Sequence, residues 1–142
     1  IAGAMRRGGR LFYIGAGTSG RLGVLDASEC APTYSVPYDL VQGVIAGGEA
    51  ALSRATEASE DDSASGVHDL MARGFSSKDV LAAIAASGRT PYVLGAVSQA
   101  RGLGATTVGI SCIPDSELSA AVDIAIDVPV GAEIITGSSL PS

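Results

Sequence analysis

Short apolar runs alternate along this chain with longer stretches in which apolar and polar residues are mixed. The short runs are bounded by glycine, proline or polar residues, as buried strands are, and they cover 11–14, 40–46, 80–85, 106–111 and 123–128. The stretches between them favour helices over 18–30, 49–58, 64–73, 91–102 and 117–121. Strands that alternate with helices pair in parallel through right-handed crossovers. We therefore predict an α/β fold, a three-layer sandwich around a parallel sheet.

Local signals mark where several of these helices begin and end. Pro32 should end the first long helix near Cys30, because proline lacks an N–H group and clashes with the preceding turn. The acidic run 60–62 can cap the helix that follows it. Pro91 suits the first turn of the helix over 91–102.

The first apolar run leads directly into a glycine-rich turn, Gly15-Ala16-Gly17-Thr18-Ser19-Gly20, and a helix is expected to follow. In an open α/β sheet such a turn lies at the carboxyl end of a strand, where ligands bind. Glycines allow a close approach of the backbone, and the N–H groups of a helix N-terminus attract an anion. With the hydroxyls of Thr18 and Ser19 and the guanidinium of Arg21, the turn predicts a phosphate site.

A second loop repeats this pattern. Ser87-Gly88-Arg89-Thr90 also follows an apolar run and opens an expected helix, and Ser138-Ser139 begins to repeat the arrangement after Ile134-Ile135. Because the carboxyl ends of parallel strands meet at one edge of the sheet, we expect these loops to bind one phosphate together.

Composition narrows the possible partners. The chain is 46% apolar but only 4% aromatic and has 19 glycines, which favours close packing of small residues. A net charge of -6 argues against nucleic acid and acidic membranes as partners, so an anion must be bound by local donors. No apolar run reaches the roughly 18 residues of a membrane helix. Cys30 and Cys112 form no disulfide or zinc pattern, which favours a reducing cytoplasm and no metal.

Two other interpretations of the glycine turn stay open. It matches the dinucleotide fingerprint, but that site also needs an acidic residue at the end of the second strand to bind the ribose. The second run ends in Ala46-Gly47-Gly48 and Glu49 comes late, so a nicotinamide cofactor is not favoured. The turn could also be a tight strand–helix connection without a ligand.

Several acidic side chains are candidates for proton transfer. Asp26 and Glu29 share one helix face, and for Asp26 we expect either a solvated position or a cap-like role. Glu29 falls in the last turn of its expected helix, where the dipole disfavours negative charge, and this suits a general acid. The run 57–62 resembles an acidic surface. His68 is the only histidine and is expected on the surface, so no Ser-His-Asp triad is predicted.

Longer strings of residues, at 15–30, 45–49, 57–61, 84–93 and 108–112, resemble the N-acetylmuramic acid 6-phosphate etherase family over nearly the whole chain. The resemblance implies a sugar isomerase (SIS) domain over residues 1–142, with a five-stranded parallel sheet, in a homodimer. It implies a cytoplasmic enzyme of cell-wall recycling without a metal or organic cofactor. That enzyme cleaves the D-lactyl ether of its phosphosugar to N-acetylglucosamine 6-phosphate and D-lactate, by elimination and then addition of water.

The resemblance also implies roles for individual residues. Glu29 corresponds to the acid and Glu60 to a second catalytic glutamate, the base at C2. Phosphate is expected on Ser19, Ser87, Thr90 and Ser138 with the backbone N–H groups of both glycine turns. A helix from Thr18 to Glu29 would span about 16 Å. We therefore expect either that Glu29 serves a site shared across the dimer or that this helix breaks early.

The chain departs from the family pattern at its ends. After Ser138-Ser139 the family continues with Arg, Lys and a further helix, whereas this chain has Leu140-Pro141-Ser142, and Ile1 to Met5 resembles the end of a helix. We expect an incomplete domain that is a poor catalyst by itself. A non-catalytic sugar-phosphate sensor and an aldose–ketose isomerase remain alternatives, and Glu29 discriminates, because neither needs an acid at C3.

Overall fold

The computed structural model describes residues 1–132 and 134. At its centre lies a five-stranded, all-parallel sheet with the strand order β2-β1-β3-β4-β5. The strands are β1 (Leu11–Gly15), β2 (Val41–Ile45), β3 (Val80–Ile84), β4 (Thr106–Ser111) and β5 (Ile124–Asp127). Every predicted strand is confirmed, and each end agrees within one residue.

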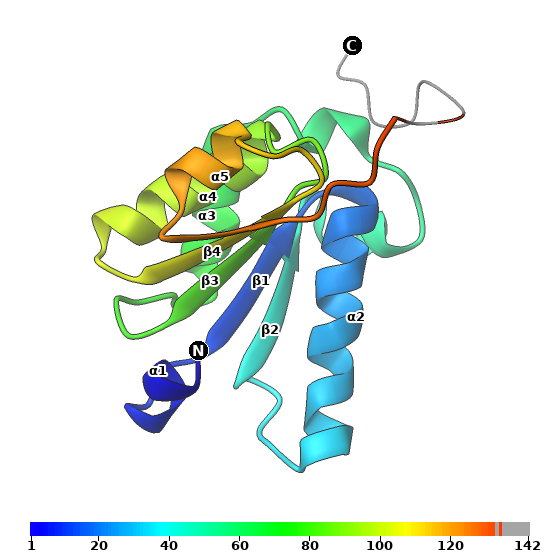
Figure 1. Cartoon of the computed structure of the whole chain (residues 1–142). Coiled ribbons are helices and arrows are strands. Elements are labelled where there is room, and N and C mark those ends of the chain that lie inside the picture. The colour runs from blue at the N-terminus through cyan, green and yellow to red at the C-terminus, as the bar shows by residue number, and fades with distance from the viewer. Residues whose placement is uncertain (133, 135–142) are drawn as a thin grey trace.

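Helices cover both faces of this sheet (Figure 1). On one face α2 (Gly17–Tyr34) lies along β1 and β2, and α1 (Ala2–Arg6) packs at the amino end of the sheet. The other face carries α3 (Ser63–Ala72), α4 (Pro91–Gly102) and α5 (Glu117–Ala121). The predicted three-layer α/β sandwich is therefore confirmed.

The core is larger on the face of α3 and α4. Side chains alternate between the two faces of a strand, so Phe12 and Ile14 of β1 point toward Tyr92 and Val97 of α4, and all four are fully buried. Phe12 also meets Phe75 edge to face, with the ring centroids 5.2 Å apart. Burying an aromatic or large aliphatic side chain stabilises a fold by about 2 kcal/mol, so these residues anchor the sheet to its helices.

Glycines bring α2 unusually close to the sheet. A Cβ added to Gly23 would lie 2.8 Å from the Cβ of Tyr13, and one added to Gly43 of β2 would lie 2.6 Å from the Cα of Val24. Larger side chains at these points would force the helix away from the strands. The close contact fixes where the N-terminus of α2 emerges at the carboxyl edge of the sheet.

The prediction that the first long helix, α2, ends near Cys30 was wrong. It continues through Pro32 to Tyr34 and stops at Ser35, which adopts a left-handed conformation with φ 53°. The added turn is held by packing, since Ala31 is 7% exposed and Cys30 contacts the smaller core cluster. Tertiary contacts here outweigh the cost of a proline near a helix end.

The prediction of a single helix over 49–58 was also wrong. Two short 3₁₀ helices, η1 (Gly48–Leu52) and η2 (Glu57–Ser59), replace it. Gly47 and Gly48 have φ of 84° and 66°, so the chain turns sharply as it leaves β2. This segment carries the chain from β2 at the sheet edge to α3 on the opposite face, which a straight helix could not do.

The predicted helix starts on that opposite face are confirmed. Asp62 caps α3, because its Oδ1 accepts hydrogen bonds from the backbone N–H groups of Ala64 (2.9 Å) and Ser65 (3.3 Å). A hydrogen bond from the Ser65 hydroxyl lowers the pKa of the Asp62 carboxyl, and these backbone hydrogen bonds add to the effect. Pro91 is the first residue of α4.

Candidate functional site

The strand order places a ligand crevice between β1 and β3. The chain leaves β1 through α2 to reach β2 on one side, and it leaves β3 through α4 to reach β4 on the other. Neighbouring strands whose connections diverge in this way open a crevice at their carboxyl ends. Gly15 pairs with Ile84 in the register, so both predicted phosphate loops, 15–20 and 87–90, lie at this crevice.

The first loop is built around glycines in close contact. A Cβ on Gly15 would lie 2.7 Å from the nitrogen of Gly20, and Gly17 has a φ of +54°. Glycine adopts this left-handed backbone without strain. Ala16 precedes α2, and no side chain caps the N–H groups of its first turn. Thr18 is exposed at this end and Ser19 is half-buried.

The second loop also leads into the N-terminus of a helix that has no side-chain cap. Gly88, with φ +66°, donates its N–H to the Ala85 carbonyl at 2.9 Å, and the backbone N–H of Arg89 donates to Ser87 Oγ at 3.3 Å. Thr90 precedes α4, which also lacks a side-chain cap. By contrast, Asp62 caps α3 and Ser116 caps α5. At the crevice α2 thus keeps first-turn N–H groups available to an anion, whereas in α4 Pro91 has no N–H group and that of Tyr92 donates to the Glu60 carbonyl.

Glu60 lies beside the first loop and the start of α4. A Cβ added to Gly17 would come within 3.1 Å of Glu60 Oε1, and the Glu60 carbonyl accepts a hydrogen bond of 3.1 Å from the backbone N–H of Tyr92 in α4. The Glu60 carboxylate therefore lies next to the first loop, and its backbone is held by the start of α4. The charge pattern alone had indicated only an acidic surface at 57–62, and the resemblance was the one signal that singled out Glu60.

Glu29 lies far from this crevice. It is exposed on α2, which runs unbroken from Gly17 to Tyr34, so an early break of the helix is excluded. At 1.5 Å per residue Glu29 is about 16 Å along the helix from Thr18. Spacings of three and four residues put Glu29 on one helix face with Leu22 and Leu25, which are 56% and 58% exposed.

The other residues considered in the sequence analysis lie on the surface or outside the described residues. The Tyr13 hydroxyl donates to Asp26 at 2.7 Å, so Asp26 is exposed but bonded, and burial together with this bond raises the pKa of Tyr13. The His68 side chain is 82% exposed, as expected. Ser138 lies outside the described residues. Within the described part of the chain, no group of three or more His, Cys, Asp or Glu residues could hold a metal ion.

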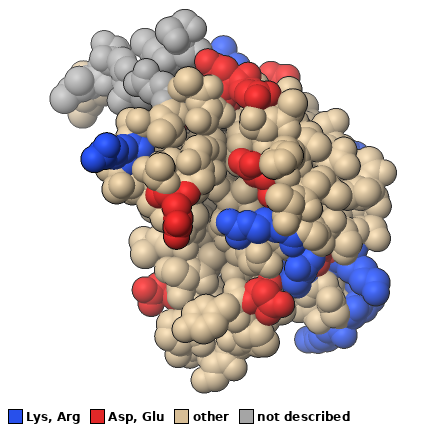
Figure 2. Space-filling model, turned by 180° about the vertical axis from the view of Figure 1, so that it is seen from behind, with Lys and Arg blue, Asp and Glu red and all other residues tan. Residues whose placement is uncertain are grey.

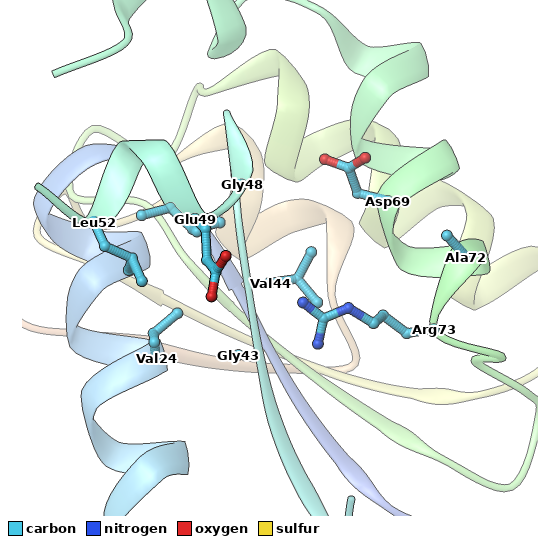
Figure 3. A pocket seen from close by; sticks show the side chains of 10 residues that line it. Val24, Gly43, Val44, Gly48, Glu49, Leu52, Asp69, Ala72 and Arg73 are labelled. Carbon is cyan, nitrogen blue, oxygen red and sulfur yellow. The ribbon is translucent and has the colours of Figure 1, made fainter. Parts of the chain in front are cut away.

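A separate hollow of about 410 Å³ lies along the outer edge of β2 (Figure 3). Glu49 from η1 and Arg73, which follows α3, point into it from opposite sides, over Gly43 and Val44. None of the predicted site residues lines this hollow. The carboxyl ends of β1 and β3, where the two loops lie, therefore remain the candidate site.

Charged side chains are unevenly spread over the molecule. On the face turned away from the view of Figure 1, acidic side chains are scattered from top to bottom, and basic ones gather from the centre toward the lower right (Figure 2). With a net charge of -6, the overall field repels an anion. A phosphate at the crevice therefore depends on the local N–H and hydroxyl donors. None of the helices within residues 1–132 is long and apolar enough to cross a membrane.

Curated proteins similar to this chain carry the name of one enzyme. N-acetylmuramic acid 6-phosphate etherase from Actinobacillus pleuropneumoniae serotype 5b is 60% identical over 139 residues, which are 98% of this chain and 46% of that protein. The etherase from Clostridium botulinum strain Hall is 57% identical over the same shares. The chain thus spans about half the length of the curated relatives it matches.

Solved structures share the fold. Phosphoheptose isomerase from Neisseria gonorrhoeae superimposes with a TM-score of 0.68 at 19% identity, over 91% of this chain and 68% of that one. An Escherichia coli CFT073 protein solved in complex with a ligand has a TM-score of 0.58 at 19% identity, over 88% of this chain and 55% of that one. The family model of the glucokinase regulatory protein N-terminal SIS domain matches residues 1–101, most of the chain. With the parallel sheet and the crevice between β1 and β3, this match means that the chain belongs to that family of SIS domains.

Proposed function

We propose that this chain is the phosphosugar-binding part of an N-acetylmuramic acid 6-phosphate etherase, which releases D-lactate and N-acetylglucosamine 6-phosphate. The observation that carries the proposal is the Glu60 carboxylate beside Gly17, at the carboxyl ends of β1 and β3. Identities of 57% and 60% to curated etherases over 98% of the chain support the same activity.

The substrate phosphate binds between the two loops in this proposal. The first-turn N–H groups of α2 donate to it, and the N-termini of α2 and α4 turn the positive ends of their helix dipoles toward it. Hydroxyls complete the shell, and the exposed Arg89 adds a positive charge. The proposed phosphate-binding residues are Gly17, Thr18, Ser19, Gly20, Ser87, Gly88, Arg89, Thr90 and, outside the described residues, Ser138.

Glu60 acts on the sugar as the base. In the open-chain form the substrate is an aldehyde, which makes its C2 proton acidic. Glu60 removes this proton, the electron pair forms a C2=C3 double bond, and the C3–O bond to the lactyl group breaks. An acid protonates the departing oxygen, which gives D-lactate. Water then adds at C3 while C2 regains a proton, so the product is N-acetylglucosamine 6-phosphate.

The acid, Glu29, comes from a second copy of the chain. A hexose phosphate cannot reach from the first loop to Glu29 along about 16 Å of intact helix. Leu22 and Leu25 expose apolar surface beside Glu29, which suits a helix face that packs against a partner. A symmetric homodimer formed through α2 would bring the Glu29 of one copy toward the crevice of the other.

The proposal extends to the cellular setting. The partner is a small-molecule phosphosugar, bound by one SIS domain, and the reaction belongs to cell-wall recycling in the cytoplasm. Cys30 and Cys112 are both free, which is in keeping with a reducing compartment.

The test is to incubate the complete protein with N-acetylmuramic acid 6-phosphate and assay D-lactate. Glu60→Gln should abolish turnover while N-acetylglucosamine 6-phosphate still binds. Glu49→Gln, which removes an exposed carboxylate on η1, is the matched control and should keep turnover. Phosphosugar binding without D-lactate release by the wild type would contradict the etherase and indicate a regulatory domain.

A further inference from the structure

A chain of hydroxyl groups lies under the second phosphate loop and ends on a carboxylate. Ser111 at the end of β4 is 2% exposed and Ser116 before α5 is 7% exposed. Their Oγ atoms are 3.2 Å apart, and Ser116 Oγ is 2.9 Å from Ser119 Oγ. The Ser119 hydroxyl in turn lies 2.6 Å from Oδ1 of Asp127 at the end of β5. None of these residues was among those predicted from the sequence, although a serine directly before a short helix is a usual cap signal.

The carboxylate sets the direction of these hydrogen bonds. Ionised Asp127 only accepts, so Ser119 donates its single hydroxyl proton to it. Ser119 Oγ is then left as an acceptor for the hydroxyl of Ser116. Ser116 Oγ also accepts the backbone N–H of Ser119 at 3.2 Å, which fixes the serine rotamer at the start of α5.

Ser116 is in direct contact with Gly88 of the loop. A Cβ on Gly88 would lie 2.2 Å from Ser116 Oγ, so the glycine backbone rests on this side chain. The Gly88 carbonyl accepts a hydrogen bond of 2.8 Å from the backbone N–H of Leu118 in α5. In a planar trans peptide the N–H points opposite to the carbonyl. Directing the Gly88 carbonyl toward α5 therefore turns the N–H of Arg89 away from α5, toward the side of the loop where Ser87 Oγ lies.

We propose that Ser116, held by Ser119 and Asp127, is a positioning residue that orients the Gly88–Arg89 peptide and the Ser87 hydroxyl for the phosphate of the substrate. This inference rests on the proposed phosphosugar site. It adds α5 and the end of β5, which do not touch the ligand, to the determinants of phosphate affinity.

The test uses Ser119→Ala and Asp127→Ala in the complete protein, because both break the chain of hydroxyls without removing the Ser116 oxygen that caps α5. Calorimetry with N-acetylglucosamine 6-phosphate should find affinity reduced about threefold to tenfold, the loss expected for a misplaced hydrogen bond. KM should rise by a similar factor with kcat nearly unchanged. The double variant should lose little more than either single one, because both act through the same chain.

Ser76→Ala is the matched control, since it removes another serine–aspartate hydrogen bond, to Asp79, at the opposite edge of the sheet. It should leave affinity unchanged. If Ser119→Ala and Asp127→Ala lower only the melting temperature and bind like Ser76→Ala, the positioning role is wrong while the phosphosugar site stands. If the wild type itself does not bind the phosphosugar, both the site and this role are wrong.

Discussion

Glu60 and Gly17 are neighbours in space, with the carboxylate Oε1 3.1 Å from the point where a Cβ on Gly17 would lie. One residue belongs to the glycine turn after β1, and the other to the acidic segment before α3. The contact joins the two faces of the sandwich at the crevice, because Glu60 also accepts a backbone hydrogen bond from Tyr92 of α4. The loop that we propose to bind phosphate and the proposed base, Glu60, therefore lie side by side.

Gly17→Ala should therefore lower turnover. The new methyl group would displace the Glu60 carboxylate, and the left-handed backbone would cost about 1 kcal/mol of stability. Gly48→Ala is the matched control, because Gly48 has a φ of +66° but nothing within 4 Å of its Cβ position. Both variants should lose similar stability in urea unfolding, and only Gly17→Ala should lose D-lactate release. Equal turnover in the two variants would contradict a catalytic role for the Glu60 position.

If each active site takes Glu60 from one chain and Glu29 from the other, two inactive variants should restore activity when they form a mixed dimer. In a mixed dimer of Glu29→Gln and Glu60→Gln chains, one of the two sites has both glutamates if they come from different copies. An equal mixture, unfolded together and refolded, should recover about a quarter of wild-type D-lactate release, from random pairing in a two-fold dimer. Each variant refolded alone is the control. No recovery in dimers shown to be mixed would place both glutamates in one chain's site and exclude the arrangement across α2.

The contact between α3 and α4 should tolerate no side chain at Gly66. A Cβ there would lie 1.9 Å from the carbonyl oxygen of Tyr92, whose N–H binds the Glu60 carbonyl. Gly66→Ala should lower the free energy of unfolding by about 3 kcal/mol, the upper range for overpacking. Gly102→Ala, at the end of α4 with nothing within 4 Å, should be neutral or stabilising. Denaturant titrations of both variants check this.

Asp79 should make stability depend on acid pH. It is 3% exposed and accepts hydrogen bonds from Arg10 N (2.8 Å), Arg10 Nη2 (3.0 Å) and Ser76 N (2.8 Å). Burial by itself raises the pKa of this carboxyl, but these hydrogen bonds and the guanidinium charge outweigh it and leave the pKa below its usual value. The unfolded chain therefore binds the proton at higher pH than the folded one. The stabilisation is complete above the unfolded pKa of about 3.9 and is lost as pH falls through the folded pKa.

Asp79→Asn should accordingly lower the free energy of unfolding by about 3 kcal/mol at neutral pH, because it leaves the guanidinium of Arg10 without its charged partner. The difference from wild type should shrink below about pH 4. Asp39→Asn, which alters an exposed carboxylate, is the control and should change little at any pH. A difference that stays constant from pH 7 to pH 3 would contradict this account of Asp79.

The sequence by itself determined the order of elements and the location of the two loops. Strand and helix signals depend on only a few neighbouring residues, so they can be recognised without knowing the rest of the fold. Examples are the apolar runs 11–14 and 106–111 and the helix-starting proline Pro91. The glycine turn at 15–20 and its counterpart at 87–90 were recognised in the same way. Parallel pairing then placed both at one edge of the sheet.

Only the tertiary structure decided what depends on residues far apart in the chain. Packing of Ala31 carries α2 past Pro32, and the passage around the edge of β2 breaks the segment over 49–58 into 3₁₀ turns. The contact of Glu60 with Gly17 and the support of Gly88 by Ser116 belong to the same class. All of these features escape prediction from the sequence for the same physical reason. Each depends on which segments approach within van der Waals distance, and a local pattern of apolar and polar residues does not encode that distance.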